Sequence, residues 1–132
     1  MGYDYLIFDA DHTVIDFDAD ERRAFRAAFA AAGLAPDPDM VEDCWAFSAR
    51  NWAELGLNDV HLPGLRARYH ELYHTHVRDI MRYADTMYGL GARKGAAERA
   101  FSETLAHAAH PVAGAVETLN ALSRKYRLCI AT

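Results

Sequence analysis

Near its N-terminus the chain reads Tyr3-Asp-Tyr-Leu-Ile-Phe-Asp9-Ala-Asp11-His-Thr13, and the architecture follows from this stretch. Residues 3–8 are an aromatic and branched apolar run, whose length and composition predict a buried β-strand. Two carboxylates, Asp9 and Asp11, follow it at once. Because ligands bind beyond the carboxyl ends of strands in an open α/β sheet, we expect both side chains to face a site.

An Asp-x-Asp pair directly after a strand can divide two chemical tasks. One carboxylate can serve as a nucleophile and metal ligand, and the other as a general acid and base. The pair also offers the oxygen ligands that suit Mg²⁺. Aspartates also cap helices, so the spacing alone leaves a structural interpretation open. The preceding strand, together with Thr13 and the apolar Val14-Ile15 that follow, favours the functional interpretation.

Helical periodicity dominates the middle of the chain. The predicted helices run from Asp18 or Asp20, either of which can cap, to about 32, and then over 39–55, 63–83, 95–107 and 114–125, with a flexible connection over 88–95. A second strand is predicted over 126–132. The two strands are expected to pair in parallel, because a helix crosses between them.

The predicted fold class is therefore α/β, with a helical insertion after the first strand. Residues 1–17 and 110–132 form a partial α/β core, and residues 18–109 form a helical cap. A structureless loop of that length would be unusual, which favours the cap.

Composition excludes several function classes. The formal net charge is −5 and Lys or Arg never occur more than two in a row, so no nucleic-acid partner is expected. No segment has the roughly 18 apolar residues of a membrane span, and we expect a cytoplasmic protein. Cys44 and Cys129 form no metal-type pair and are interpreted as reduced, buried small side chains.

The run from Leu6 to Asp18, Leu-Ile-Phe-Asp-Ala-Asp-His-Thr-Val-Ile-Asp-Phe-Asp, resembles motif I of the haloacid dehalogenase (HAD) superfamily. Its form, with the later Phe-Asp, resembles the pyrimidine 5′-nucleotidase branch. Residues 110–122 and 126–132 resemble the helix and strand that lead to motif II. The resemblance implies a HAD-like Rossmannoid core, incomplete here, with the helical insertion as its cap.

The resemblance also implies chemistry. Asp9 would attack phosphorus to form an aspartyl-phosphate, and Asp11 would protonate the leaving alcohol and then activate water. Asp9 and the backbone carbonyl of Asp11 would hold Mg²⁺. Thr13 and Thr132 would bind the phosphorylated substrate, with Thr132 donating to a phosphoryl oxygen. The implied function is a Mg²⁺-dependent phosphomonoesterase for small substrates, with nucleoside monophosphates as the expected class.

Two cap residues are further candidates for substrate binding. Trp52 could face the substrate, although it shares a helix face with Trp45 and could equally belong to the cap core. Arg68 could hold a base or phosphate, although a solvated helix arginine is the default. His70, His74 and His76 lie on one predicted helix, but no carboxylate or Cys partner accompanies them, so surface or cap-interface histidines are favoured over a metal site.

The sequence departs from the HAD pattern at three places, of which Ala113, in place of a common Pro before Gly114, has the least consequence. His12 stands where the family commonly has Gly or a small or acidic residue. The family's third-motif Lys and fourth-motif acidic residues lie beyond motif II, whereas this sequence stops at Thr132. We therefore expect a fragment with little or no activity by itself. The alternative is a non-catalytic helical binding module; a receiver-like domain is disfavoured by the long helical stretch.

Overall fold

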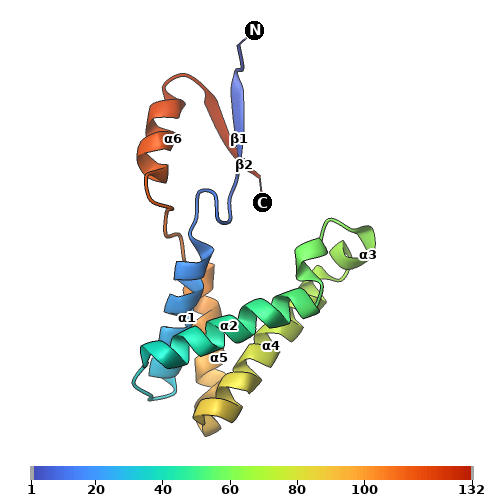
Figure 1. Cartoon of the computed structure of the whole chain (residues 1–132), viewed down its shortest axis with the longest axis vertical. Coiled ribbons are helices and arrows are strands. Elements are labelled where there is room, and N and C mark those ends of the chain that lie inside the picture. The colour runs from blue at the N-terminus through green and yellow to red at the C-terminus, as the bar shows by residue number, and fades with distance from the viewer. Residues whose placement is uncertain (1, 132) are drawn as a thin grey trace. The chain divides into compact units, whose positions relative to one another are not determined.

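The structure is a computed structural model that describes residues 2–131 (Figure 1). Its elements are β1 (Tyr5–Asp9), α1 (Phe17–Ala31), α2 (Pro38–Glu54), the 3₁₀ turn η1 (Leu57–Asp59), α3 (Pro63–Arg66), α4 (Tyr69–Tyr88), the 3₁₀ turn η2 (Gly91–Arg93), α5 (Lys94–Ala106), α6 (Ala115–Ser123) and β2 (Arg127–Ala131). They form two compact units. The sheet unit contains the residues up to Glu21 and those from His107 onward, and the helical unit is Arg22–Ala106.

The sheet unit is built on the two strands, which pair in parallel as predicted. Their register runs from Tyr5 opposite Arg127 to Asp9 opposite Ala131. Helix α6 contacts β2 and supplies the crossover that parallel strands need. Pairing places Asp9 at the carboxyl end of β1, at the edge of the sheet where α/β proteins hold their ligands.

Helix α1 begins earlier than predicted and has a different cap. Its first residue is Phe17, and the Asp16 carboxylate accepts a hydrogen bond from the amide of Ala19 at 3.0 Å. This is the usual geometry of an aspartate N-cap, which satisfies an amide that has no partner within the helix. The prediction that Asp18 or Asp20 caps the helix was wrong, because both lie in its first turn.

The helical unit has a continuous apolar core, to which α1, α2, α4 and α5 all contribute (Figure 1). The rings of Phe25 and Phe101 meet with their centroids 4.9 Å apart, and Phe29 meets Tyr88 edge-on at 5.6 Å. Each fully buried aromatic side chain of this kind stabilises the fold by about 1.5–3 kcal/mol. The core residues are Ala24, Phe25, Ala28, Phe29, Ala32, Val41, Cys44, Val77, Ile80, Met81, Ala84, Leu90, Ala97 and Phe101.

One predicted helix is divided in the structure. The pattern over 63–83 becomes the single turn α3 and the longer α4, because Arg68 leaves the helical conformation with φ −106° and ψ 6°. Helix α4 then continues to Tyr88 and ends at Gly89, whose φ of 72° is the left-handed conformation that glycine adopts without strain.

The predicted flexible connection over 88–95 is a defined turn. The carboxylate of Asp85 accepts from the amide of Gly91 at 2.9 Å and lies 3.8 Å from the ammonium group of Lys94. These contacts tie the end of α4 to the start of α5. The glycines that suggested flexibility instead provide the left-handed residues of a tight turn, at Gly89 and Gly91.

The two cysteines lie in different environments. Cys44 is buried in the helical core as predicted, and that burial raises the pKa of its thiol to about 12. Cys129 is exposed on β2, so its predicted burial was wrong. The reason is the sheet: across residues 2–131 it has two strands, and no further layer covers this position. No helix in the described part of the chain is long and apolar enough to cross a membrane.

Candidate active site

The loop after β1 is held by its own backbone. The amides of Val14 and Ile15 both donate to the carbonyl of Ala10 at 2.9 Å, and the amide of His12 donates to the carbonyl of Ile15 at 2.8 Å. Ala10 is 4% exposed, so this small residue forms the buried pivot of the turn. His12 has a φ of 58°, which a histidine adopts more readily than a bulky apolar residue.

This turn presents the two predicted catalytic carboxylates to solvent. Asp9 and Asp11 are both exposed. The hydroxyl of Thr13 reaches back to the Asp9 carboxylate at 3.4 Å, a long hydrogen bond. The structure therefore places Asp9 at the end of β1 and Asp11 and Thr13 in the loop that follows it. An exposed carboxylate whose contact with Thr13 is this long remains accessible to an incoming electrophile or cation.

The end of the loop, at residues 14–16, is hydrogen-bonded to residues 110–112. The amide of Asp16 donates to the carbonyl of His110 at 2.7 Å, and the amide of Val112 donates to the carbonyl of Val14 at 2.9 Å. The buried carboxylate of Asp20 binds His110 twice, at the backbone amide (3.0 Å) and at ring Nδ1. The sequence did not predict this contact, because an aspartate near the start of a helix is expected to cap it.

Magnesium is the cofactor that the resemblance implies. The donors available in the loop are carboxylate and carbonyl oxygens, which match the preference of Mg²⁺. Residues 2–131 contain no cluster of three or more His, Cys, Asp or Glu side chains arranged as a metal site. Two carboxylates nevertheless fit this ion in kind, because Mg²⁺ commonly binds through one or two carboxylates and keeps waters or substrate phosphate oxygens as its other ligands.

An apolar hollow lies beside Thr13 in the sheet unit. Its lining comes from the end of β1, the loop and the start of α6. The residues are Phe8, Thr13, Val14, Val112, Ala113, Gly114, Ala115, Thr118 and Leu119. The two threonines are its polar side chains, so the hollow offers little to bind a charged phosphate.

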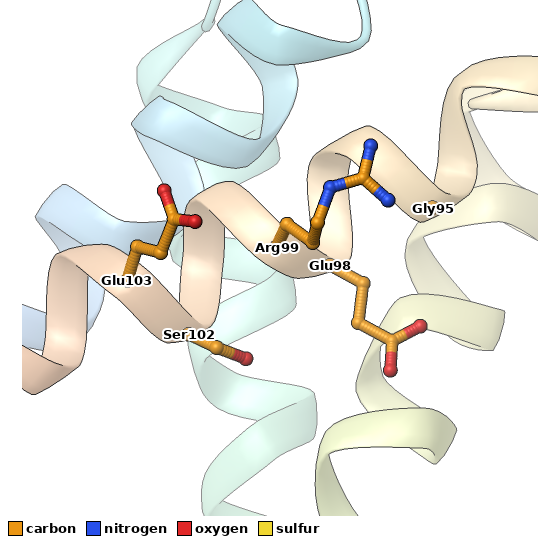
Figure 2. A pocket seen from close by; sticks show the side chains of 5 residues that line it. All are labelled: Gly95, Glu98, Arg99, Ser102 and Glu103. Carbon is orange, nitrogen blue, oxygen red and sulfur yellow. The ribbon is translucent and has the colours of Figure 1, made fainter.

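A second hollow, on the helical unit, carries no convergent chemistry. It is lined by Gly95, Glu98, Arg99, Ser102 and Glu103, all from α5. Figure 2 shows their side chains spreading in different directions along the helix. Ligand sites place a few polar groups so that they converge on one point, and this surface does not.

The two predicted cap residues lie in the helical unit, and both already have partners there. Trp52, on α2, meets the ring of His76 edge-on at 5.2 Å. Arg68 binds Glu71 through two hydrogen bonds of 3.1 and 3.0 Å, and this pairing lowers the pKa of the exposed Glu71 carboxyl. Their role in binding substrate stays a prediction. Thr132, the predicted phosphate ligand, lies outside the described residues.

A buried polar network in the helical unit also escaped sequence analysis. The ring of His76 contacts Asn51 Oδ1 through Nδ1 at 2.7 Å and Ser48 Oγ through Nε2 at 3.2 Å. All three side chains are buried, and burial lowers the pKa of His76 to about 4. His76 is thus a neutral core residue that joins α2 to α4, unlike the exposed His70 and His74 on the same helix.

No family model matches this chain, and no curated protein matches it. Among solved structures it is similar to YfnB from Bacillus subtilis, a protein named as a HAD-hydrolase, in an orthorhombic form bound to magnesium that is described as revealing interdomain movement. The TM-score is 0.67 and the identity 23%, over 100% of this chain and 53% of that one. The chain spans about half the length of YfnB, and what the likeness establishes is its fold: α/β with a small parallel sheet and a helical insertion, as in part of a HAD-hydrolase.

Proposed function

We propose that the protein is a phosphomonoester hydrolase in which Asp9 is the nucleophile. The observation that carries the proposal is the loop at the carboxyl end of β1, which exposes Asp9 and Asp11 while its backbone is closed on the carbonyl of Ala10. The HAD-like fold supports it, because the fold places this loop where an α/β sheet binds its ligands.

The two carboxylates would perform different steps. Asp9 would attack the phosphorus of a monoester, forming an aspartyl-phosphate as the P–O bond to the alcohol breaks. Asp11 would donate a proton to the departing alcohol and would then take one from the water that hydrolyses the intermediate. Thr13 would orient the Asp9 carboxylate through the hydroxyl contact at 3.4 Å.

Asp9 and the backbone carbonyl of Asp11 would hold Mg²⁺, which supplies Lewis-acid neutralisation of the phosphate charge when it is bound. The protein's own contribution is to present oxygen ligands on a turn whose backbone is already ordered. Both carboxylates are exposed and so accessible to an ion from solvent.

Small phosphorylated molecules are the proposed substrates, with nucleoside monophosphates as the preferred class. This choice rests on the resemblance of residues 6–18 to the pyrimidine nucleotidase branch. We propose that the helical unit acts as the cap that selects the leaving group, with Trp52 and Arg68 as its candidate contacts. For Arg68 this requires that substrate compete with Glu71 for the guanidinium group.

Phosphate release tests the proposal directly. Full-length protein is assayed with Mg²⁺ against a panel of nucleoside and sugar monophosphates, before and after chelation of the metal. We expect metal-dependent turnover that Asp9→Asn abolishes, because the amide is a poor nucleophile. Asp4→Asn is the matched control, since Asp4 is also exposed and precedes β1.

Turnover of no panel member, or an Asp9→Asn protein as active as the wild type, would contradict the proposal. The second result would favour a non-catalytic binding module. The same assay on the 132-residue chain tests the expectation that these residues alone release little or no phosphate.

A further inference from the structure

Both carboxylate oxygens of Asp20 bind the same residue, His110. Asp20 lies on α1, is 1% exposed, and binds the backbone amide of His110 through Oδ2 at 3.0 Å and the ring Nδ1 of His110 through Oδ1. A buried carboxylate is costly unless its lone pairs are satisfied, so a single residue that satisfies both oxygens is firmly placed.

His110 is also fixed through its carbonyl. That oxygen accepts from the amide of Asp16 at 2.7 Å, and the next residue, Pro111, lies opposite Ile15 in an antiparallel bridge. His110 is therefore bound to Asp16 and Asp20 by its backbone amide, its backbone carbonyl and its ring. Without the ring contact, only the backbone contacts would hold residues 110–111 against residues 15–20.

Ile15 links residues 110–111 to the Asp9–Asp11 loop. It faces Pro111 on one side, while its amide donates to Ala10 and its carbonyl accepts from His12. A displacement of residues 110–111 would therefore be transmitted to Ala10 and His12 through Ile15. These two residues flank Asp11, and Ala10 follows Asp9 directly.

We propose that Asp20 and His110 are positioning residues that hold the Asp9–Asp11 loop in its ordered turn. They act on the loop through Asp16 and Ile15. The inference rests on the proposed function only for its catalytic meaning; the ordering of the loop is a separate, measurable property.

The test compares three variants of the full-length protein by amide hydrogen exchange. His110→Ala removes the ring, while His110→Asn retains a side-chain N–H donor in a similar place. His61→Ala is the control, an exposed histidine of the helical unit. The probes are the hydrogen-bonded amides of the loop, at His12, Val14 and Ile15, with amides of α4 as the internal reference.

We expect His110→Ala to speed exchange of the loop amides by at least roughly tenfold, the order of a lost hydrogen bond to a charged group, with α4 unchanged. His110→Asn should restore most of the protection, and His61→Ala should have no effect. Titration with Mg²⁺ alone should show weaker binding by His110→Ala than by His110→Asn.

Two results would overturn the inference: loop exchange within about twofold of wild type in His110→Ala, or acceleration spread equally over α4, which indicates loss of global stability. Failure of the wild type to bind Mg²⁺ or release phosphate would instead count against the proposed function. The exchange rates would still decide whether the pair orders the loop.

Discussion

The sheet unit and the helical unit are stabilised internally by different interactions. Every buried apolar side chain in the described residues except Ala10 belongs to the helical unit. The sheet unit instead exposes large apolar side chains, among them Tyr3 at 81%, Ile7 at 72% and Ile130 at 56%. Its order comes from the strand ladder, the backbone hydrogen bonds of the Asp9–Asp11 loop and the Asp20–His110 contact.

This difference has an energetic consequence. Burial of apolar surface contributes about 25 cal/mol per Å², so the helical unit has its own source of stability. A two-stranded sheet with little covered surface is marginal in water. The two carboxylates with proposed catalytic roles, Asp9 and Asp11, therefore lie in the less stabilised unit, as is common for sites that must admit and release ligands.

Thiol reactivity should separate the units most sharply. Burial raises the pKa of Cys44 to about 12, whereas Cys129 is exposed. At pH 8 an aromatic disulfide reagent should modify Cys129 at least roughly 10³ times faster than Cys44, because a buried thiol presents almost no thiolate. Cys129→Ser should remove the fast phase. Absence of a fast phase in the wild type would mean that this face of the sheet is covered, and the contrast between the units would fail.

Substitution in the two units should have unequal effects on stability. Phe25→Ala should lower the free energy of unfolding by about 3–5 kcal/mol, because it leaves a cavity beside Phe101. Ile7→Ala should cost less than about 0.5 kcal/mol, because Ile7 is largely exposed. Urea denaturation followed by circular dichroism measures both changes. Equal costs would show that the sheet unit has a core of its own.

Acid should destabilise the helical unit through His76. Its pKa is lowered to about 4 by burial, with Asp79 opposing the shift, while the unfolded chain keeps a value near 6.5. The folded state thus binds fewer protons, so the contribution is complete above pH 6.5 and is lost as the pH falls towards 4. We expect a loss on the order of 2 kcal/mol between pH 7 and pH 5.

Thermal unfolding across this pH range, followed by helical circular dichroism, measures the effect. His76→Gln should flatten the profile between pH 7 and pH 5, because glutamine can bond Ser48 or Asn51 without titrating. His74→Gln is the matched control on the same helix, and its profile should follow the wild type. A wild-type profile without a slope would show that His76 is solvated in the folded protein.

The features that could be predicted from sequence are those with local signatures. The apolar run before Asp9 predicts β1 and the helical crossover predicts parallel pairing, and both agree with the structure, although β1 is half exposed where a buried strand was predicted. The proximity of Asp9, Asp11 and Thr13 follows from their adjacency in the sequence. Except for the predicted helix over 63–83, which is divided, the helices have boundaries that differ from the predicted ones by a few residues, because helix ends depend on caps such as Asp16.

The features that could not be predicted depend on partners far away in the sequence. Asp20 finds His110 across 90 residues, and His76 finds Ser48 across 28, and neither pairing leaves a pattern in the chain. Burial of Cys129 was expected because it belongs to no metal-type pair, but burial depends on what covers the strand that carries it.

The pairing of β1 with β2 also bears on the order in which the chain folds. Tyr5 and Arg127 are neighbours across 122 residues of sequence. Closing a flexible loop of that length costs about 4 kcal/mol in chain entropy, whereas the helices gain their contacts over much shorter separations. Folding the helical unit first removes most of the free chain from this loop. Strand β1 therefore stays unpaired until β2 has been made, and in the meantime it is exposed to pairing with other chains.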